Sequence, residues 1–244
     1  MDSGDALIEL RGVGFAYGAT RSVLADVDWS VRRQERWALL GANGSGKTTL
    51  LNLLVGLLKP TAGELAALNR PRKTERDFKE VRRHLGLVFQ NPDDQLFCPT
   101  VAEDVAFGPI NLGWEQQEIE TAVTGTLAAL GLDGYQDRVT YQLSFGEKRL
   151  VSLATVIAMK PDLLLLDEPT ANLDSHTTDV LLRYLSEEWR GGVLLVTHNP
   201  AAVKRLCDHV AVLSNGRMVA SGPVKQVMAD SGLLISVGLE GFGK

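Results

Sequence analysis

Residues 41–49 of the chain read GANGSGKTT. They satisfy the pattern G-x-x-x-x-G-K-[ST], which is typical of a loop that binds phosphate groups. Residues 36–40 (RWALL) form a short apolar run that predicts a buried strand, and residues 48–57 predict an apolar helix. The predicted order is therefore strand, glycine-rich loop and helix, which is the order that this pattern requires.

The residue types in this loop suit a phosphate ligand. Gly41, Gly44 and Gly46 lack a Cβ and let backbone N–H groups approach phosphate oxygens, while the following helix points its unpaired N–H groups at them. Lys47 would reach the β- and γ-phosphates, and the Thr48 hydroxyl would take a place on Mg²⁺. We therefore expect a nucleotide here. The candidate nucleotide-binding residues of the loop are Gly41, Asn43, Gly44, Ser45, Gly46, Lys47, Thr48 and Thr49.

Length and composition limit the alternatives. The 244 residues suffice for one large α/β domain, or one domain with an inserted subdomain, and 45% hydrophobic and 23% charged residues are close to the globular average. The net charge of −5 disfavours nucleic acid as a partner, because that needs clustered Lys and Arg. No apolar run approaches the roughly 18 residues that span a bilayer, and the start MDSGDALIEL does not resemble a signal peptide, so we expect a cytoplasmic chain. Cys98 and Cys207 show no metal-ligand or disulfide spacing.

The N-terminal part of the chain is β-like. Residues 7–18 and 22–31 are short runs with alternating apolar positions, which predict an antiparallel β edge lying against the main sheet. Tyr17, in FAYG at the end of the first run, is an aromatic residue that we expect on a turn. It is either a partly packed turn residue or a surface on which an adenine ring stacks, and the residues alone leave both interpretations open.

A second core strand is predicted beyond the first loop and helix. Residues 70–83 are a charged segment that we expect to be a surface connection, and residues 84–89 (HLGLVF) predict the strand, which ends at Gln90. Ligands bind at the carboxyl edge of parallel sheets, so Gln90 is a candidate site residue, although one glutamine is a weak signal. The arginines that we expect on the solvated surface are Arg11, Arg70, Arg72, Arg76, Arg82 and Arg83.

The middle of the chain predicts a helical insertion between two strands of the core. Helices are expected near residues 101–107, 115–130 and 147–159. Ser144 and Glu147 form a capping box at the start of the third helix. Ser144 either only caps this helix or marks a second anion site at its N-terminus, and composition alone favours the cap.

Two further strands end in polar residues. Residues 162–168 (DLLLLDE) predict a buried strand that ends in two carboxylates. We expect Asp167 to hold Mg²⁺, commonly through water, and Glu168 to polarise the attacking water. Residues 191–197 predict another core strand. His198 at its end could contact a γ-phosphate, although a single histidine is usually structural.

The C-terminal part carries little signal. Residues 209–214 and 217–220 predict a hairpin with its turn at Asn215-Gly216. The tail from residue 231 is rich in glycine and predicts nothing further.

Together these motifs resemble the ATP-binding cassette (ABC) ATPases over residues 7–228. Residues 89–113 (FQNPDDQLFCPTVAEDVAFGPINLG), including Asp93-Asp94-Gln95, further resemble the ATPases of energy-coupling factor transporters, which import vitamins and transition-metal ions, and most of all the cobalt/nickel branch. The positions that match the family, in its order, are Tyr17 for adenine stacking, residues 41–49 (Walker A), Gln90 (Q-loop), residues 143–147 (signature), residues 163–168 (Walker B), residues 171–174 (D-loop) and His198 (switch histidine).

The signature departs from the family's usual LSGGQ. Phe145 replaces the first glycine and Glu147 replaces the glutamine, and Leu150 stands where a basic residue is common. Ser144 and Gly146 are kept. We therefore expect a working but altered signature, in which Phe145 points away from the phosphate.

The resemblance implies a P-loop NTPase (RecA-like) fold, with a parallel-sheet core, an antiparallel β edge and an inserted helical subdomain. The expected division is residues 1–90 and 161–230 for the nucleotide-binding core, 91–160 for the helical signature subdomain and 231–244 for a tail.

It also implies ATP and Mg²⁺ as ligands. The expected catalytic residues are Glu168, His198 and Gln90, the metal residues are Thr48, Gln90 and Asp167, and Ser144 and Gly146 face the ATP of a second chain. The partners would be an identical or a different ABC ATPase and integral membrane subunits, with no nucleic acid, at the cytoplasmic face of the membrane. The cargo would be cobalt or nickel. The alternatives are a vitamin such as biotin, a soluble ABC protein acting on nucleic acid or ribosomes, and a simple P-loop kinase.

Overall fold

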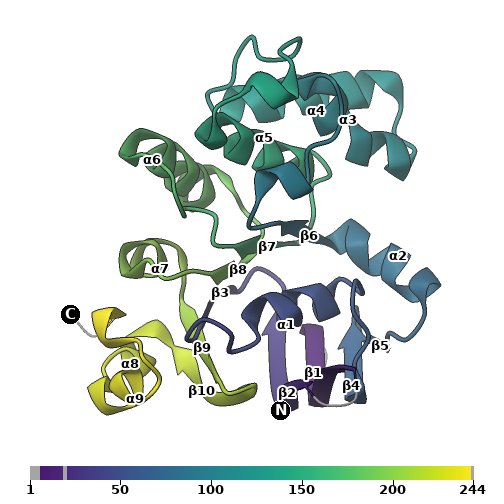
Figure 1. The fold of residues 1–244 in the computed structure, drawn as a ribbon. Coiled ribbons are helices and arrows are strands. Elements are labelled where there is room, and N and C mark those ends of the chain that lie inside the picture. Colours follow the sequence, from purple (N-terminus) through teal and green to yellow (C-terminus); the bar gives the residue numbers. More distant parts are fainter. Residues whose placement is uncertain (1–5, 19–20, 243–244) are drawn as a thin grey trace.

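The computed structural model describes residues 6–18 and 21–242, which form two sheets with helices around them (Figure 1). The larger sheet has the strand order β10-β9-β3-β8-β7-β6. Strands β9, β3, β8, β7 and β6 run parallel to one another, whereas β10 is antiparallel to β9. The predicted parallel core and C-terminal hairpin are thus confirmed. The bounds are β3 (Arg36–Leu40), β6 (Leu85–Val88), β7 (Leu163–Asp167), β8 (Gly192–Val196), β9 (His209–Ser214) and β10 (Arg217–Pro223).

The antiparallel strands form a sheet of their own, which packs against the parallel sheet in one apolar cluster. Its order is β2-β1-β4-β5. Near Asp26, where φ is 55°, the pairing with β1 shifts and the inward-facing residues change from Leu24 to Val27. The simple alternation that we expected across this strand therefore breaks at a bulge. The bounds are β1 (Ala6–Tyr17), β2 (Arg21–Arg32), β4 (Ala62–Ala67) and β5 (Arg70–Pro71).

The leucine run of β7 explains why the parallel sheet lies in the centre. Leu163 and Leu165 pack in one apolar cluster with helices α1 (Lys47–Leu54) and α2 (Glu75–His84) and the antiparallel sheet, whereas Leu164 and Leu166 pack in the other cluster with the remaining helices. Both faces of the strand are therefore buried, and four successive apolar residues are needed where a half-exposed strand would alternate.

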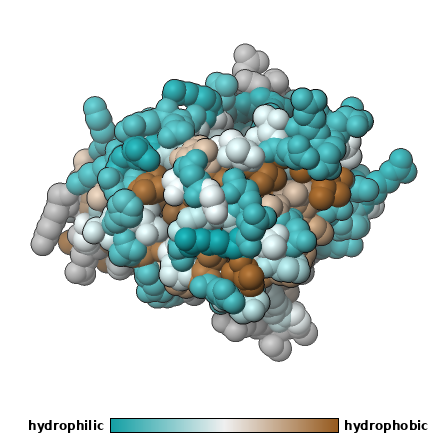
Figure 2. All heavy atoms as spheres, turned by 90° about the horizontal axis from the view of Figure 1, so that it is seen from above, coloured by the Kyte–Doolittle hydropathy of each residue, from teal (hydrophilic) through white to brown (hydrophobic). Residues whose placement is uncertain are grey.

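Three helices gather at one end of the molecule, above the parallel sheet (Figure 1). They are α3 (Val101–Leu112), α4 (Gln116–Ala129) and α5 (Phe145–Ile157), and they confirm the predicted helices of the insertion. Seen from this end, the surface is mainly hydrophilic with scattered hydrophobic residues (Figure 2). Among the described residues, no helix has both the length and the apolar character needed to cross a membrane.

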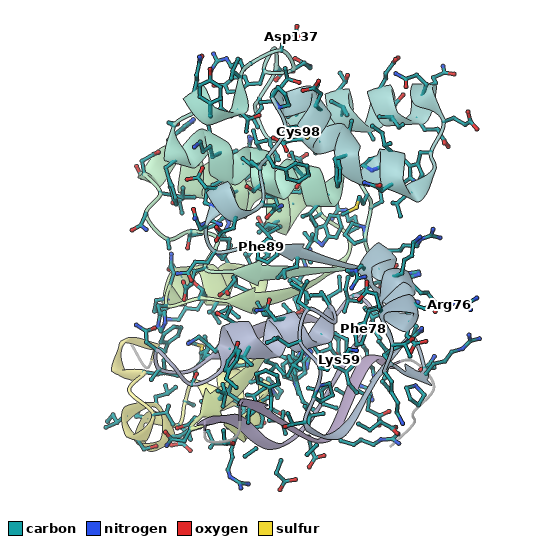
Figure 3. The ribbon with its side chains drawn as sticks, turned by 45° about the vertical axis from the view of Figure 1, so that its right-hand side comes forward. Lys59, Arg76, Phe78, Phe89, Cys98 and Asp137 are labelled. Carbon is teal, nitrogen blue, oxygen red and sulfur yellow. The ribbon has the colours of Figure 1, made fainter. Side chains whose placement is uncertain are left out.

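The charged segment at residues 70–83 is not an irregular connection, as we expected, because most of it is helix α2 (Glu75–His84). Thr74 caps this helix, and Figure 3 shows Phe78 pointing inward and Arg76 outward. The expectation that Arg72 lies on the solvated surface is also wrong. Its side chain is buried and donates to the main-chain carbonyl of Ala67 at 2.9 Å.

The C-terminal tail packs against the body of the protein, which the sequence did not indicate. It contains α9 (Ser231–Ser236), and the short helix α8 (Val224–Val227) precedes it. Leu234, Leu239 and Phe242 are buried in the same cluster as residues of α7 (Pro200–Leu206). The remaining helix, α6 (Ser175–Arg183), starts at the Asp174 cap and continues as a π-helical turn to Glu188.

Candidate functional site

The phosphate-type loop joins β3 to α1 at the carboxyl edge of the parallel sheet. Gly46 caps α1 with a φ of 108°, and a Cβ at this position would lie 2.8 Å from Leu24 Cδ2 of β2. Gly44 has a φ of 78° in open space, so glycine is needed there for its backbone conformation alone. The loop therefore presents backbone N–H groups and the N-terminus of α1 to one cavity.

Lys47 lies folded along this loop. Its ammonium group donates to the main-chain carbonyls of Gly41 at 2.7 Å and Ala42 at 3.0 Å. Burial lowers the pKa of Lys47, and the carboxylates of Asp167 and Glu168 partly oppose that shift. A cation is thus held beside two acidic groups at the loop.

The end of β7 faces the start of α1. The Thr48 hydroxyl donates to Asp167 Oδ2 at 2.7 Å. Asp167 is only 4% exposed, and burial raises the pKa of its carboxyl, with the Thr48 hydrogen bond and Lys47 acting in the opposite direction. Gln90 lines the same cavity. Carboxylate, hydroxyl and amide oxygens are the ligand types that Mg²⁺ prefers, so these three side chains fit that ion.

Glu168 follows Asp167 in an unusual backbone conformation, with a φ of 48°. Burial raises the pKa of its carboxyl, while the charge and the backbone N–H of His198 favour the ionised form. Glu168 Oε2 accepts from the His198 backbone N–H at 3.3 Å, and Oε1 lies 3.4 Å from His198 Nε2. His198 Nε2 is also 3.1 Å from Asn43 Oδ1. A strained residue that carries a poised carboxylate is typical of a catalytic site.

The structure brings most of the predicted residues together in one cavity of about 420 Å³. Gly41 and Ser45 are buried and do not line it, and Ser144 and Gly146 are not part of the lining either. Val23 and Val196 also line the cavity, and no sequence signal distinguished them from other buried strand residues. The predicted residues that line it are Tyr17, Asn43, Gly44, Gly46, Lys47, Thr48, Thr49, Gln90, Asp167, Glu168 and His198.

Tyr17 lines this cavity as the last residue of β1, and not on a turn as we expected. Its ring is 48% exposed and meets Phe15 edge to face, with 4.8 Å between the ring centres. The adenine-stacking interpretation stays a prediction, which the exposure of Tyr17 and its place in the cavity lining allow.

The N-terminus of α5 carries the altered signature. Ser144 and Glu147 form the predicted capping box. The Glu147 carboxylate also accepts from the Tyr135 hydroxyl at 2.6 Å and from Arg138 at 3.1 Å, and the Tyr135 hydrogen bond is the main reason that its pKa is lowered. Glutamate at this position therefore ties the preceding loop to the helix, which a neutral glutamine would do less strongly.

Gly146 allows α5 to approach α6 closely. A Cβ on Gly146 would lie 3.1 Å from Thr177 Oγ1. Asp174, in the segment matched to the D-loop, caps α6 by accepting from Thr177. Phe145 is 38% exposed, and its ring centre lies 5.6 Å from the guanidinium carbon of Arg149. That Phe145 points away from a bound phosphate stays a prediction.

Comparison with known proteins agrees with this site. The ABC transporter family model matches residues 24–171. An energy-coupling factor transporter ATP-binding protein, EcfA, of Methanothermobacter thermautotrophicus is 41% identical over 93% of this chain and 74% of its own length. The chain belongs to the ABC transporter ATPases. It binds ATP and hydrolyses it to ADP and phosphate.

Other relatives of this ABC ATPase extend the comparison. The nickel import ATP-binding protein NikO of Rhodobacter capsulatus is 43% identical over 93% of this chain and 92% of its own. The structure of cbiO1 from Clostridium perfringens, described as part of the transporter complex cbiONQ, superimposes with a TM-score of 0.83 at 34% identity, covering 96% of this chain and 95% of that one. A dimeric ATP-binding cassette bound to ADP and phosphate gives a TM-score of 0.79 at 26% identity, over 88% of this chain and 98% of its own.

Proposed function

We propose that this ABC ATPase powers an energy-coupling factor importer for a transition-metal ion, cobalt or nickel. The observation that carries the proposal is the path of residues 89–97. Gln90 lines the ATP cavity, whereas Phe89, Gln95 and Phe97 line a groove beside it. One segment of the chain thus lines both the ATP cavity and a groove in which a membrane partner can dock.

Within the ATP cavity we assign roles by position. The loop N–H groups and Lys47 hold the phosphates, and Tyr17 stacks on the adenine. Glu168 accepts hydrogen bonds from the attacking water and so orients a lone pair of the water oxygen toward the γ-phosphorus. His198 lies beside Glu168 and holds the γ-phosphate. Thr48, Asp167 and Gln90 would hold Mg²⁺, which when bound supplies positive charge to the β- and γ-phosphate oxygens.

We propose that two chains complete each ATP site. The N-terminus of α5 offers a capped helix end and a glycine, yet it does not line the ATP cavity of its own chain. The ABC relative in the post-hydrolysis state is dimeric. In this arrangement Ser144 and Gly146 contact the γ-phosphate held by the other chain, which is either identical to this one or a second ABC ATPase.

The groove is the proposed docking surface for the membrane subunits. It has a volume of about 460 Å³ and lies between α2, β6 and the helices α3 and α5. Its apolar walls include Phe97 and Phe107, whose rings meet edge to face and are 66% and 47% exposed. Lys79, Arg82 and Arg83 add positive charge at α2. A helix of the partner with an apolar face and acidic flanks would suit this groove.

The metal-ion cargo is supported by the relatives. NikO is named for nickel import, and cbiO1 belongs to the cbiONQ complex. The alternative cargo is a vitamin such as biotin, because EcfA-type relatives match to a similar extent. In either case the membrane partners would bind the cargo and hold this chain at the cytoplasmic face of the membrane.

Purification from the native cell with a mild detergent tests this function. We expect small integral membrane proteins to copurify, and the reconstituted complex to take up cobalt or nickel only when ATP is supplied. ATP-driven uptake of a vitamin instead would favour the alternative cargo. Recovery of ribosomes or nucleic acid without membrane proteins would contradict the transport function.

A further inference from the structure

Arg149 on α5 is a buried charged residue that does not line the ATP cavity. Its side chain is 1% exposed. The guanidinium donates to the main-chain carbonyl of Phe89 at 2.6 Å and to the carbonyl of Gln90. Among the described residues, no carboxylate forms an ion pair with it. A full charge is thus buried and directed at two successive carbonyls.

Burying the charge of Arg149 costs free energy. An apolar side chain of similar size often fills a buried site at lower free energy than a charged one. Burial lowers the pKa of Arg149, although Asp167 favours its charged form. The planar guanidinium can donate to both carbonyls at once, which a lysine cannot do with the same geometry. The guanidinium therefore holds the backbone at residues 89 and 90 in a fixed position.

Two neighbouring contacts join the same loop to α5. Lys148 forms an ion pair with Asp93 at 2.6 Å. The Gln95 amide donates to the Ser152 carbonyl at 2.7 Å and to Thr155 at 2.8 Å. Together with Arg149, these contacts attach the loop along about two turns of α5, from Lys148 to Thr155.

The two elements that Arg149 joins, the loop at Gln90 and the N-terminus of α5, belong to different ATP sites in the proposed dimer. Gln90 lines the ATP cavity of this chain. Ser144, at the start of α5, lies outside that cavity and, in the proposed dimer, faces the ATP of the other chain. Ser144 and Arg149 are only about one and a half helical turns apart on α5.

We propose that Arg149 is a positioning residue that couples the two ATP sites of the dimer, an inference that rests on the proposed dimeric function. The guanidinium makes the loop at Gln90 and the N-terminus of α5 move as one body. When ATP in one site draws Gln90 inward, α5 is carried into the position that closes the other site.

The test compares two buried arginines in a Glu168→Gln background, where ATP is held without turnover. Arg149→Met removes the donors but keeps the length, and Arg149→Lys retains a charge that reaches one carbonyl. Arg72→Met and Arg72→Lys are the controls, because Arg72 is 4% exposed and also donates to a main-chain carbonyl, yet it lines no part of the ATP cavity. Unlike Arg149, Arg72 also forms an ion pair, with Glu80.

Three measurements are made on each variant: ADP affinity, the ATP concentration that gives half-maximal dimer, and, with Glu168 restored, the turnover number. For Arg149→Met we expect ADP affinity within about twofold of the parent, an ATP requirement raised about tenfold or more, and turnover lowered about tenfold or more. Arg149→Lys should lie between. The Arg72 variants should change only thermal stability.

The inference would be overturned if Arg149→Lys matched the parent in dimer formation and turnover, even if Arg149→Met did not fold. It would also be overturned if the Arg72 variants lost dimer formation and turnover to the same extent. Failure of the parent itself to form an ATP-dependent dimer would count against the proposed function, and the inference would fall with it.

Discussion

At the residue scale, the cavity places one carboxylate where water must be activated. Glu168 is held by its backbone conformation and by His198, and burial raises its pKa. A carboxylate that holds its proton more tightly than usual is a stronger base once ionised. Asp167 is different, because it is more deeply buried and accepts from Thr48. The two adjacent acids therefore suit different tasks, water activation and metal binding.

Glu168→Gln separates these tasks. The change removes the group that polarises water and leaves Lys47, Thr48 and Asp167 in place. We expect ATP hydrolysis to fall by a factor on the order of 10² or more, with ATP affinity retained and a closed dimer accumulating in ATP. Phosphate release and dimer formation measure this, with the exposed Glu120→Gln on α4 as control. Turnover near that of the unmodified chain would remove Glu168 from the mechanism.

The raised pKa of Asp167 also predicts how stability depends on pH. The folded chain binds this proton more tightly than the unfolded chain, whose ordinary value is 3.8, so the free energy of unfolding falls as pH rises through the raised folded pKa. Asp167→Asn removes this loss. We expect its Tm at about pH 7 to exceed that of the unmodified chain by a few degrees, with the difference shrinking as the pH is lowered.

Thermal unfolding from about pH 5 to 8 measures this difference. Asp137→Asn, on a loop of the helical end (Figure 3), is the control and should have no comparable effect. A lower Tm for Asp167→Asn at neutral pH would show that the charge stabilises the fold, contrary to the expected direction.

At the element scale, residues 89–97 connect the ATP cavity to the groove. Gln95 joins the Phe89 N–H to α5, whereas Asp94 is exposed. We expect Asp94→Ala to leave most of the ATPase activity and to lower transport several-fold. Asp94 belongs to the segment that connects the ATP cavity to the groove and not to the phosphate loop. Gln95→Ala should lower transport as well, and it should also lower the Tm, because hydrogen bonds that hold the loop on α5 are lost.

Transport by cells that carry each variant, with ATPase activity and Tm of the purified chain, separates these effects. Asp133→Ala, exposed on the loop after α4, is a matched surface control. Unchanged transport in both the Asp94 and the Gln95 variant would exclude this segment from coupling.

The same scale shows what the sequence could predict. The strand β7, the loop at residues 41–49 and the capped start of α5 were predictable because each carries a local pattern. Helix α2 was missed because only Phe78 and Val81 are buried in ten residues, so its charged face hid the periodicity.

Contacts between distant segments were beyond such patterns. Asn43 and His198 are 155 positions apart, and Arg149 and Phe89 are 60 apart. Arg149 did leave one signal, a charged residue beside the apolar stripe of α5, but its partners could be known only from the fold. The burial of Arg72 and of Leu234 in the tail likewise depends on elements that pack from elsewhere in the chain.

At the scale of the whole molecule, one chain has an ATP cavity at one place and the signature helix at another. If the signature serves only its own fold, Ser144→Arg costs roughly 0.5 to 2 kcal/mol of stability by loss of the cap and leaves ATP capture nearly intact. If it faces the other chain's γ-phosphate, the same change blocks closure of the dimer. Thr100 caps α3 with the same kind of capping box, so Thr100→Arg is the matched control for the loss of a cap.

Mixed dimers distinguish the two interpretations, given that the chain forms homodimers and exchanges partners. Lys47→Ala damages the phosphate loop and Ser144→Arg damages the signature helix, so neither variant should occlude ATP alone. In a mixed pair, one site carries both defects, and the other joins the intact phosphate loop of the Ser144→Arg chain to the intact helix of the Lys47→Ala chain. That site should occlude ATP, and Thr100→Arg homodimers should occlude it as the unmodified chain does. Trapped nucleotide is the measurement, because turnover can require both sites. If confirmed mixed pairs trap no more ATP than the two parents, Ser144 acts only as a cap.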